Sequence, residues 1–342
     1  MNILTALSYD DVLLVPKYSD IRSRKEVSLA SCLGREMRFE LPIISSPMDT
    51  ITETDMANAI QSSGGLGIIH RYNTIEAQAD FVRRIEHGTK AAAIGISGDY
   101  LQRARALVDA GANILCLDVA HGHHILMKEA LEKIKLLYGE DVHIMAGNVA
   151  TKEGFEDLSR WGADSIRCNI GGGSICSTRI QTGHGIPGLH TILECIQADI
   201  DRDVSIIADG GMRNSGDIVK ALAAGADFVM IGSLLSGTRE TPGDIIHCGS
   251  HNKDKRKVYR GMASKEAQFA WRGKHSSNEG IATHVPYRGP VAPIIEDLAN
   301  GIRSGFSYSG ARNLVEFQMN SEFIVQTPSG QAESGTHILT RE

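Results

Sequence analysis

The chain has 342 residues, of which 42% are hydrophobic and 22% are charged, a balance typical of a globular protein and not of a disordered one. Its formal net charge of −6 argues against nucleic acid as the main partner. The first residues lack the basic region and apolar core typical of a signal peptide, and no uninterrupted apolar run approaches the roughly 20 residues of a membrane span. We therefore expect a cytoplasmic protein with no membrane partner.

Short apolar runs bounded by Gly, Pro or Asp recur along the chain, and each interval between them can hold one crossover helix. Several runs are apolar almost throughout, which is typical of strands buried on both faces of a parallel sheet. Eight such units predict a (β/α)8 TIM barrel, with an open doubly wound sheet as the alternative. The predicted strands are Leu41–Pro47, Leu66–His70, Ala91–Ile96, Asn113–Val119, Val142–Ala146, Asp164–Ile170, Val204–Ala208 and Asp227–Ile231.

The intervening segments carry helix signals. Tyr100–Ala110 and His124–Leu137 have amphipathic patterns, and Ser215–Ala224 runs into Gly225, a common helix stop. A further helix is predicted over Pro293–Arg303, with its proline at the tolerated first position.

Two segments depart from this rhythm. Residues 238–288 are rich in charge, Gly and Ser, and they predict a hairpin followed by a flap, with the Lys/Arg run at 253–257 on a solvated hairpin. Residues 327–342 predict an irregular tail that frays or docks on a neighbouring subunit. The whole chain, residues 1–342, is predicted to be a single catalytic domain.

In such a barrel the active site forms at the carboxyl ends of the strands. Gly171–Gly173 follow the sixth predicted strand and allow a loop whose backbone approaches another group closely. This loop presents Cys176 among hydroxyl groups and beside Arg179, and the residues alone leave open a reactive thiolate or an inert buried thiol. The other candidates at strand ends are Ser46, Met48, Asp49, His70, Asp118, His121, Asn148, Asp209, Gly232 and Ser233.

Two glycine turns predict a phosphate site. Gly210-Gly211 and Gly232-Ser233 follow the seventh and eighth predicted strands, where backbone N–H groups bind anions without Lys or Arg. With Asp209 as an acceptor for a ribose diol, these turns predict a phosphorylated, ribose-bearing ligand. No Gly-x-Gly-x-x-Gly follows an early strand, so a nicotinamide cofactor would bind without a Rossmann unit. The histidine run at 121–124 favours structural or ligand-contact roles over a metal site.

Ordered motifs over nearly the whole chain resemble those of the IMP dehydrogenase and GMP reductase family. The cysteine loop Gly171–Arg179 is the most specific of them. The other matching motifs are Tyr9–Pro16, Ser45–Thr50, Gly64–His70, Ala146–Thr151, Ala208–Gly211, Tyr259–Met262 and Glu279-Gly280. The resemblance implies a TIM barrel, a homotetramer, a purine nucleotide substrate and a nicotinamide cofactor.

The resemblance also implies roles for single residues. Cys176 would attack C2 of the purine to form a covalent thioimidate, and Thr178 and Glu279 would relay a proton. Substrate contacts are implied for Ser46, Met48, Asp209, Gly211, Gly232, Ser233, Tyr259, Gly261 and Met262. Cofactor contacts are implied for Asp118, Ala120 and Asn148, and potassium ligation for the backbone carbonyls of Gly171, Gly173 and Cys176.

The branch of the family depends on the flap. Only 17 positions separate Met262 from Glu279 (279 − 262), and that interval lacks the Arg-Tyr pair with which the dehydrogenases activate water. No regulatory module of the CBS type interrupts the barrel after its second predicted strand, which also favours the reductase. In contrast, Ser45–Thr50, Ala208–Asp217 and Ile302–Gly305 resemble the dehydrogenases, and Gly172 stands where proline is common.

We therefore expect a GMP reductase that uses NADPH, or else NADH, to convert GMP to IMP and ammonia. Three alternatives stay open: an NAD-dependent IMP dehydrogenase, a divergent member acting on a related purine nucleotide, and a non-catalytic nucleotide-binding barrel.

Overall fold

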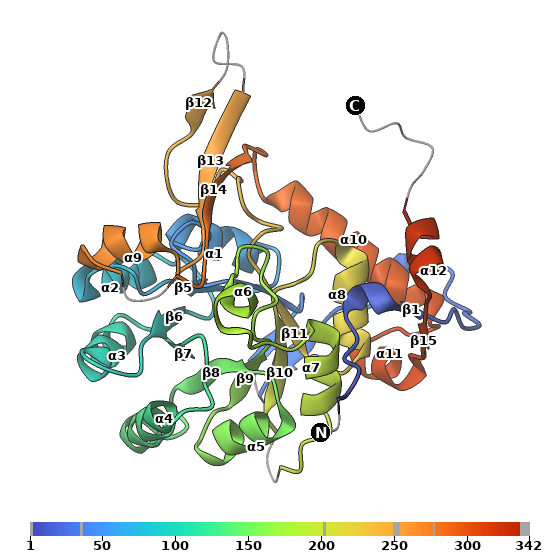
Figure 1. Cartoon of the computed structure of the whole chain (residues 1–342), viewed down its shortest axis with the longest axis horizontal. Coiled ribbons are helices and arrows are strands. Elements are labelled where there is room, and N and C mark those ends of the chain that lie inside the picture. The colour runs from blue at the N-terminus through green and yellow to red at the C-terminus, as the bar shows by residue number, and fades with distance from the viewer. Residues whose placement is uncertain (1–2, 35–36, 201–202, 249–253, 276–277, 336–342) are drawn as a thin grey trace.

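The computed structural model describes residues 3–34, 37–200, 203–248, 254–275 and 278–335 (Figure 1). Within these residues, parallel strands close into a barrel in the order β10-β11-β4-β5-β6-β7-β8-β9. Because β4 pairs with both β5 and β11, the sheet is closed, and the predicted TIM barrel is confirmed over the open sheet. The strands are β4 (Ile43–Ser45), β5 (Leu66–Ile69), β6 (Ala91–Ile94), β7 (Ile114–Asp118), β8 (His143–Val149), β9 (Ser165–Cys168), β10 (Ser205–Asp209) and β11 (Phe228–Ile231).

The barrel strands are apolar on both faces because each face packs against a core. Alternate residues such as Ile44, Ile68 and Met230 fill the barrel interior, whereas their neighbours pack against the surrounding helices. A hairpin of β2 (Ser31–Leu33) and β3 (Met37–Phe39) closes the amino end of the barrel, where the Phe39 ring meets Phe228 edge-on at 5.7 Å. The carboxyl end therefore remains available for a site.

Helices surround the barrel as the strand–helix pattern predicts. Several begin at a side-chain cap, as where Thr151 Oγ1 accepts from Gly154 N–H, and Gly225 follows the end of α8 at φ +112°. They are α1 (Thr54–Ser62), α2 (Ile75–Arg83), α3 (Tyr100–Asp109), α4 (Ile125–Tyr138), α5 (Lys152–Arg160), α7 (Gly188–Cys195), α8 (Ser215–Ala223) and α10 (Ala292–Tyr308). The last is longer than the predicted helix Pro293–Arg303.

The segment after the eighth barrel strand contains a sheet and a helix. The strands β12 (Ile246–Cys248), β13 (Asp254–Arg260) and β14 (Ala282–Pro286) form an antiparallel sheet that projects from the barrel in Figure 1. The predicted hairpin is thus confirmed, and the predicted flap contains α9 (Lys265–Arg272). Residues 249–253 lie outside the described residues.

Lys257 corrects the expectation of a fully solvated Lys/Arg run. Its side chain is only 3% exposed, and its ammonium donates to the carbonyls of Thr238, Arg239 and Thr241. Burial lowers the pKa of Lys257, but these carbonyl acceptors satisfy the charge. The lysine therefore fixes β13 to the loop after β11.

Segments near the two ends of the chain pair on the outside of the barrel. β1 (Val12–Leu14) pairs antiparallel with β15 (Phe323–Val325), which follows α11 (Leu314–Asn320). The predicted irregular tail is wrong for α12 (Pro328–Glu333), because Thr327 caps this helix and Pro328 occupies its first position. Residues 336–342 of that tail lie outside the described residues. No helix in the described ranges has the length and apolarity needed to cross a membrane.

Candidate active site

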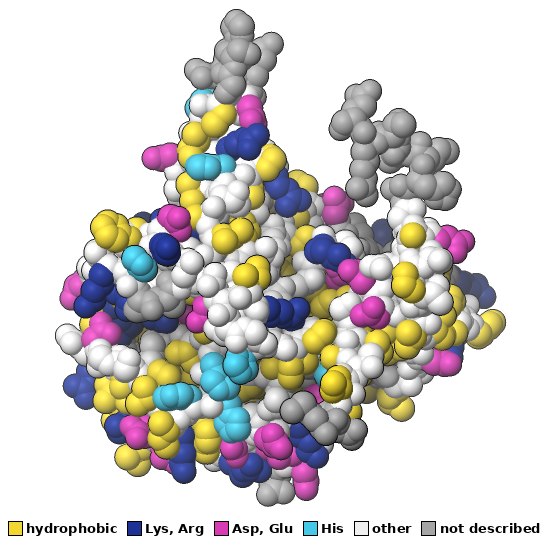
Figure 2. All heavy atoms as spheres, viewed as in Figure 1, with side chains coloured by type: hydrophobic (Ala, Val, Ile, Leu, Met, Phe, Trp, Pro, Cys, Tyr) yellow, Lys and Arg dark blue, Asp and Glu magenta, His cyan; other side chains and the backbone are white. Residues whose placement is uncertain are grey.

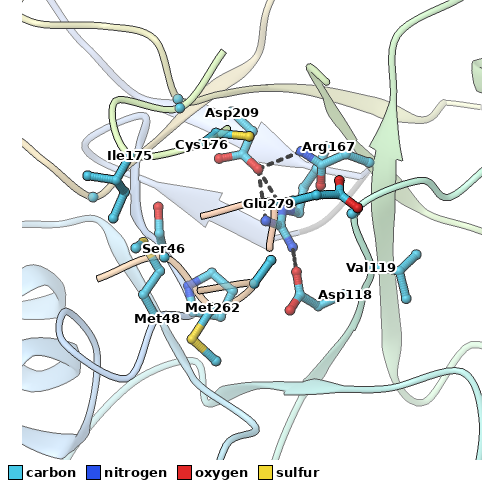
Figure 3. A pocket seen from close by; sticks show the side chains of 18 of the residues that line it. Ser46, Met48, Asp118, Val119, Arg167, Ile175, Cys176, Asp209, Met262 and Glu279 are labelled. Atoms are coloured by element: carbon cyan, nitrogen blue, oxygen red, sulfur yellow. Dashed lines mark hydrogen bonds and ion pairs between the residues drawn. The ribbon is translucent and has the colours of Figure 1, made fainter. Parts of the chain in front are cut away.

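A cavity of about 530 Å³ opens at the carboxyl end of the barrel (Figure 3). Its size lies within the range of sites for small molecules. Every site residue implied by the resemblance lines it: Ser46, Met48, Asp118, Ala120, Asn148, Gly171, Gly173, Cys176, Thr178, Asp209, Gly211, Gly232, Ser233, Tyr259, Gly261, Met262 and Glu279.

Three candidates from strand ends have other environments. Asp49 forms an ion pair with Arg260 at 2.6 Å. The buried ring of His70 lies 3.0 Å from a carboxylate oxygen of Glu53. His121 also lies outside the set of residues that line the cavity. Position at a strand end therefore selected more residues than the site uses.

The cysteine loop presents a thiol to a short proton path. The Cys176 backbone N–H donates to Gly173 O at 3.1 Å, and the Cys176 thiol lies 3.1 Å from Thr178 Oγ1. The Thr178 hydroxyl donates to Glu279 Oε2 at 2.9 Å. Because a hydroxyl has one proton, which here points to Glu279, its oxygen is free to accept from the thiol. The path runs from sulfur through a hydroxyl to a carboxylate.

The carboxylate of Glu279 reaches the thiol because residues 278–281 lie along the cysteine loop. Ser177 N–H donates to Glu279 O at 2.9 Å, and Ile281 N–H donates to Ile175 O at 3.1 Å. Cys176 and Gly280 form an antiparallel bridge between these bonds. At Gly280 an added Cβ would lie 3.0 Å from the backbone nitrogen of Ser264, so the glycine allows this close approach. The pairing fixes Glu279 relative to Cys176.

Arg167, which the sequence analysis did not select, joins two aspartates that line the cavity with it (Figure 3). Its Nη1 donates to Asp118 Oδ1 at 2.6 Å, and its Nε and Nη2 donate to Asp209 Oδ2 at 3.1 and 2.8 Å. Burial alone would raise the pKa of Asp118, but the guanidinium groups of Arg167 and Arg71 hold that pKa below its usual value. Both aspartates are thereby oriented by one buried cation.

The bonding of Asp209 leaves one oxygen for a ligand. Asn148 Nδ2 also donates to Asp209 Oδ2, at 2.8 Å, so this oxygen accepts from two side chains. The other oxygen, Oδ1, has no hydrogen bond within the described chain and belongs to a residue that lines the cavity. A hydroxyl donor such as a ribose diol fits this acceptor.

Neutral polar groups from two loops and from β13 lie close together in the cavity lining. Ser174 Oγ lies 3.1 Å from Tyr259 Oη, and burial raises the pKa of this phenol, which keeps it protonated. At Gly232 an added Cβ would lie 3.1 Å from Met48 Sδ, so glycine keeps the backbone accessible there. Backbone N–H groups and neutral hydroxyls can bind an anion without Lys or Arg, and the phosphate site expected from the glycine turns stays a prediction.

The Asp118 side of the cavity is aromatic and cationic. Tyr72 and Trp271 stack with ring centroids 4.3 Å apart and planes 14° apart. Arg71 lies over both rings, at 5.3 and 5.9 Å, and Arg272 lies 5.5 Å from the Trp271 ring. Sequence reasoning missed these residues, although a tryptophan beside an arginine in the charged flap was a signal. Such surfaces bind bases and phosphates of nucleotides.

The histidine run lies beside the cavity, and histidines gather on the face shown in Figure 2. His123 Nε2 lies 2.8 Å from Asp157 Oδ2, and His124 Nδ1 accepts from Leu126 N–H at the start of α4. Burial and the neighbouring histidines lower the pKa of His121. Among the described residues, no group of three or more His, Cys, Asp or Glu side chains could hold a metal ion.

Comparisons with known proteins point to one family. The model of the IMP dehydrogenase / GMP reductase domain matches residues 6–337. The chain is 32% identical to inosine-5'-monophosphate dehydrogenase of Nitrosopumilus maritimus, over 98% of this chain and 99% of that protein. It is 30% identical to GMP reductase of Leishmania donovani, over 98% and 97% of the two chains.

A solved structure shares the fold over the full length. The crystal structure of a GMP reductase variant from Trypanosoma brucei, in complex with guanosine 5'-monophosphate, superposes with a TM-score of 0.92. The two sequences are 30% identical, and the match covers 99% of each chain.

Proposed function

The chain belongs to the IMP dehydrogenase / GMP reductase family of purine nucleotide oxidoreductases, and from this premise we propose that it is a GMP reductase. It converts GMP and NADPH to IMP, ammonia and NADP⁺. The observation that carries the proposal is the path Cys176–Thr178–Glu279, closed over by a short flap segment. In this assignment Glu279 serves the departure of an amine.

The first step uses the proton path. The thiol proton of Cys176 passes through the Thr178 hydroxyl to Glu279, and the thiolate attacks C2 of the purine. The C2–N bond breaks as Glu279 returns the proton through Thr178 to the departing 2-amino group, which leaves as ammonia. A thioimidate then joins C2 to the Cys176 sulfur. A nicotinamide cofactor, when bound, would supply a hydride for C2. Cys176 would then leave as a thiolate and take a proton from solvent.

The remaining residues hold the ligands. Asp209 binds the ribose, with the free oxygen that Arg167 and Asn148 leave available. Gly211, Gly232, Ser233 and Tyr259 bind the phosphate, and Ser46, Met48, Gly261 and Met262 contact the base. Asp118, Ala120 and Asn148 face the cofactor. These assignments are supported by their common placement in the cavity.

A potassium ion fits the cysteine loop only through backbone carbonyls. The Gly173 carbonyl already accepts from Cys176 N–H, and it retains a second lone pair. The carbonyls of Gly171 and Cys176 accept no hydrogen bond within the described chain. We include potassium as a loop-ordering ligand on this basis. The homotetramer stays a prediction of the family resemblance.

The flap segment favours the reductase over the dehydrogenase. The 17 positions from Met262 to Glu279 include α9 and contain no Arg-Tyr pair to activate water. Chain length does not separate the two activities. The GMP reductase of Leishmania donovani aligns over 481 positions and the dehydrogenase of Nitrosopumilus maritimus over 475, both longer than this chain of 342 residues.

One assay tests the proposal. Purified protein is mixed with GMP and NADPH, and separately with IMP and NAD, while nicotinamide absorbance and ammonia are followed. We expect ammonia and IMP in equal amounts from GMP, with little reduction of NAD by IMP. Turnover only with IMP and NAD would assign the second candidate function, IMP oxidation. As a control, we expect Cys176→Ala to abolish turnover and to retain GMP binding.

A further inference from the structure

Asn169 and Gly172 share one space at the base of the cysteine loop. A Cβ added at Gly172 would lie 2.2 Å from Asn169 Nδ2, 2.7 Å from its Oδ1 and 2.8 Å from its Cγ. Asn169 is only 4% exposed and has little room to move away. Gly172 has no positive φ that would favour glycine. The asparagine side chain, and not the local backbone, therefore requires glycine at position 172.

Asn169 also contacts the loop that follows β10. Its Nδ2 donates to Asp209 O at 2.8 Å and to Gly210 O at 3.4 Å. These bonds fix the amide with its nitrogen toward the neighbouring loop, and Oδ1 is buried without a partner within the described chain. The side chain thus spans from the cysteine loop to the loop that holds the ligand ribose.

The two loops pack backbone against backbone around this amide. A Cβ at Gly210 would lie 3.5 Å from the Cα of Gly173, and a Cβ at Gly211 would lie 3.2 Å from Gly172 O. Asn169 Nδ2 lies between the two loops, 3.7 Å from the Cβ position at Gly211. Asn169 is therefore placed to set how far the cysteine loop lies from the loop of Asp209.

We propose that Asn169 and Gly172 act as one positioning pair, which fixes the Cys176 loop against the loop 209–211 and so aligns the thiol with its target carbon. The proposal rests on the proposed function only in naming that carbon as C2 of a purine nucleotide. Neither residue reacts: the pair acts through the position of Cys176. Displacing a reacting atom by about 1 Å lowers the rate on the order of 100-fold.

The pair is tested by a double-mutant cycle. In Gly172→Ala the added methyl group overlaps the side-chain amide of Asn169. Either the cysteine loop must shift, or Asn169 must lose its hydrogen bonds to Asp209 and Gly210. Asn169→Ala removes the three atoms that the methyl group would meet. We therefore expect Gly172→Ala to lower kcat by about 100-fold when position 169 is asparagine. The same substitution should lower kcat by less than about tenfold in the Asn169→Ala background.

Three measurements distinguish a change in the position of Cys176 from a loss of folding and from an error in the assigned substrate. Rates are measured with whichever nucleotide the wild-type protein turns over, together with the affinity for GMP and the rate at which iodoacetamide alkylates Cys176. Alkylation, resolved by peptide mass spectrometry, needs no nucleotide. It therefore tests the pair even if the wild-type protein reduces no GMP and the proposed function fails. Gly330→Ala, where the nearest atom to the Cβ lies at 3.5 Å, is the control for glycine replacement.

Support requires that Gly172→Ala change both turnover and Cys176 alkylation strongly in the Asn169 background and weakly in the Asn169→Ala background. Equal effects in the two backgrounds would overturn the proposal, as would a harmless Gly172→Ala. If Gly172→Ala does not fold, the double variant must recover folded protein, and its failure to do so overturns the proposal as well.

Discussion

Arg167 is a charged residue in the middle of a buried strand, and its surroundings explain how the barrel tolerates it. Its guanidinium bonds to Asp118 and Asp209, which keep its pKa well above the usual value although burial opposes the charge. At Gly147 an added Cβ would lie 2.6 Å from the Cβ of Arg167, so glycine leaves room for the arginine. Arg167 is therefore central to the orientation of both aspartates.

Because the guanidinium group of Arg167 donates to two carboxylates, we predict that lysine cannot replace this arginine. Arg167→Lys keeps the charge but loses the planar set of donors that reaches two carboxylates at once. We expect at least about tenfold weaker binding of both GMP and the cofactor, measured by calorimetric titration. Arg167→Met, which leaves two buried carboxylates without a cation, should cost about 3–5 kcal/mol of unfolding free energy. Unchanged affinity for either ligand in Arg167→Lys would contradict the shared role.

A second prediction for a single residue concerns Glu279. Glu279→Gln retains an acceptor for the Thr178 hydroxyl but no longer takes up a proton. We expect turnover of GMP to fall by about 10²- to 10⁴-fold while the affinity for GMP stays within about threefold. Single-turnover kinetics and equilibrium binding provide the two measurements. Near-normal turnover in this variant would show that another group protonates the departing amine.

At the scale of elements, α9 forms one wall of the cavity. It begins at the cap Ser264, whose Oγ accepts from Ala267 N–H, and it ends at Gly273 with φ +66°. Trp271 near its end stacks on Tyr72, which follows β5. The helix is therefore anchored to the barrel by this stack.

The stack of Tyr72 and Trp271 predicts that replacing Trp271 weakens the use of the cofactor and leaves the use of the substrate unchanged. Trp271→Ala removes the aromatic surface beside Arg71 and Arg272, and we expect the KM for NADPH to rise by about five- to tenfold. The KM for GMP should stay nearly constant. Phe269→Ala on the same helix is the matched control, because Phe269 is 63% exposed. Equal changes in both variants would mean that Trp271 acts only through the stability of α9.

At the scale of the whole molecule, the two ends of the barrel differ in chemistry. The carboxyl end holds the charged cavity, whereas the β2–β3 hairpin and the first residues of the strands seal the amino end. Asp227, just before β11, is mostly buried there and accepts from Ile206 N–H at 2.8 Å. Burial raises the pKa of its carboxyl from 3.8 to about 6, so the folded protein holds this proton up to a higher pH than the unfolded chain does.

This raised pKa predicts how stability depends on pH. The folded state binds a proton at Asp227 more tightly than the unfolded state, so stability falls as the pH rises from about 4 to about 6. Asp227→Asn removes that loss and should stabilise the protein by about 2–3 kcal/mol at pH 7.5, with no gain below pH 4. Urea unfolding at both pH values measures it. The control Asp80→Asn, at an exposed position, should change the unfolding free energy equally at both pH values. A gain in stability from Asp227→Asn that does not depend on pH would show that the raised pKa is not its cause.

The sequence by itself determined the barrel and the composition of the site. Strands buried on both faces leave continuous apolar runs, and their carboxyl ends place Cys176, Asp118 and Asp209 around one opening whatever the details of packing. The motifs then identified Thr178 and Glu279 as partners of the cysteine. All these features depend on the order of residues along the chain, which the sequence states directly.

Only the tertiary structure decided which partners these residues meet. The inward side of β9 turns Arg167 toward both aspartates, and barrel closure brings the amide of Asn169 against Gly172 and the loop after β10. The stack of Tyr72 on Trp271 and the buried ammonium of Lys257 join segments far apart in the sequence. A charged or aromatic residue has the same letter whether it faces solvent or a partner. Strand register and closure of the barrel determine which environment it has.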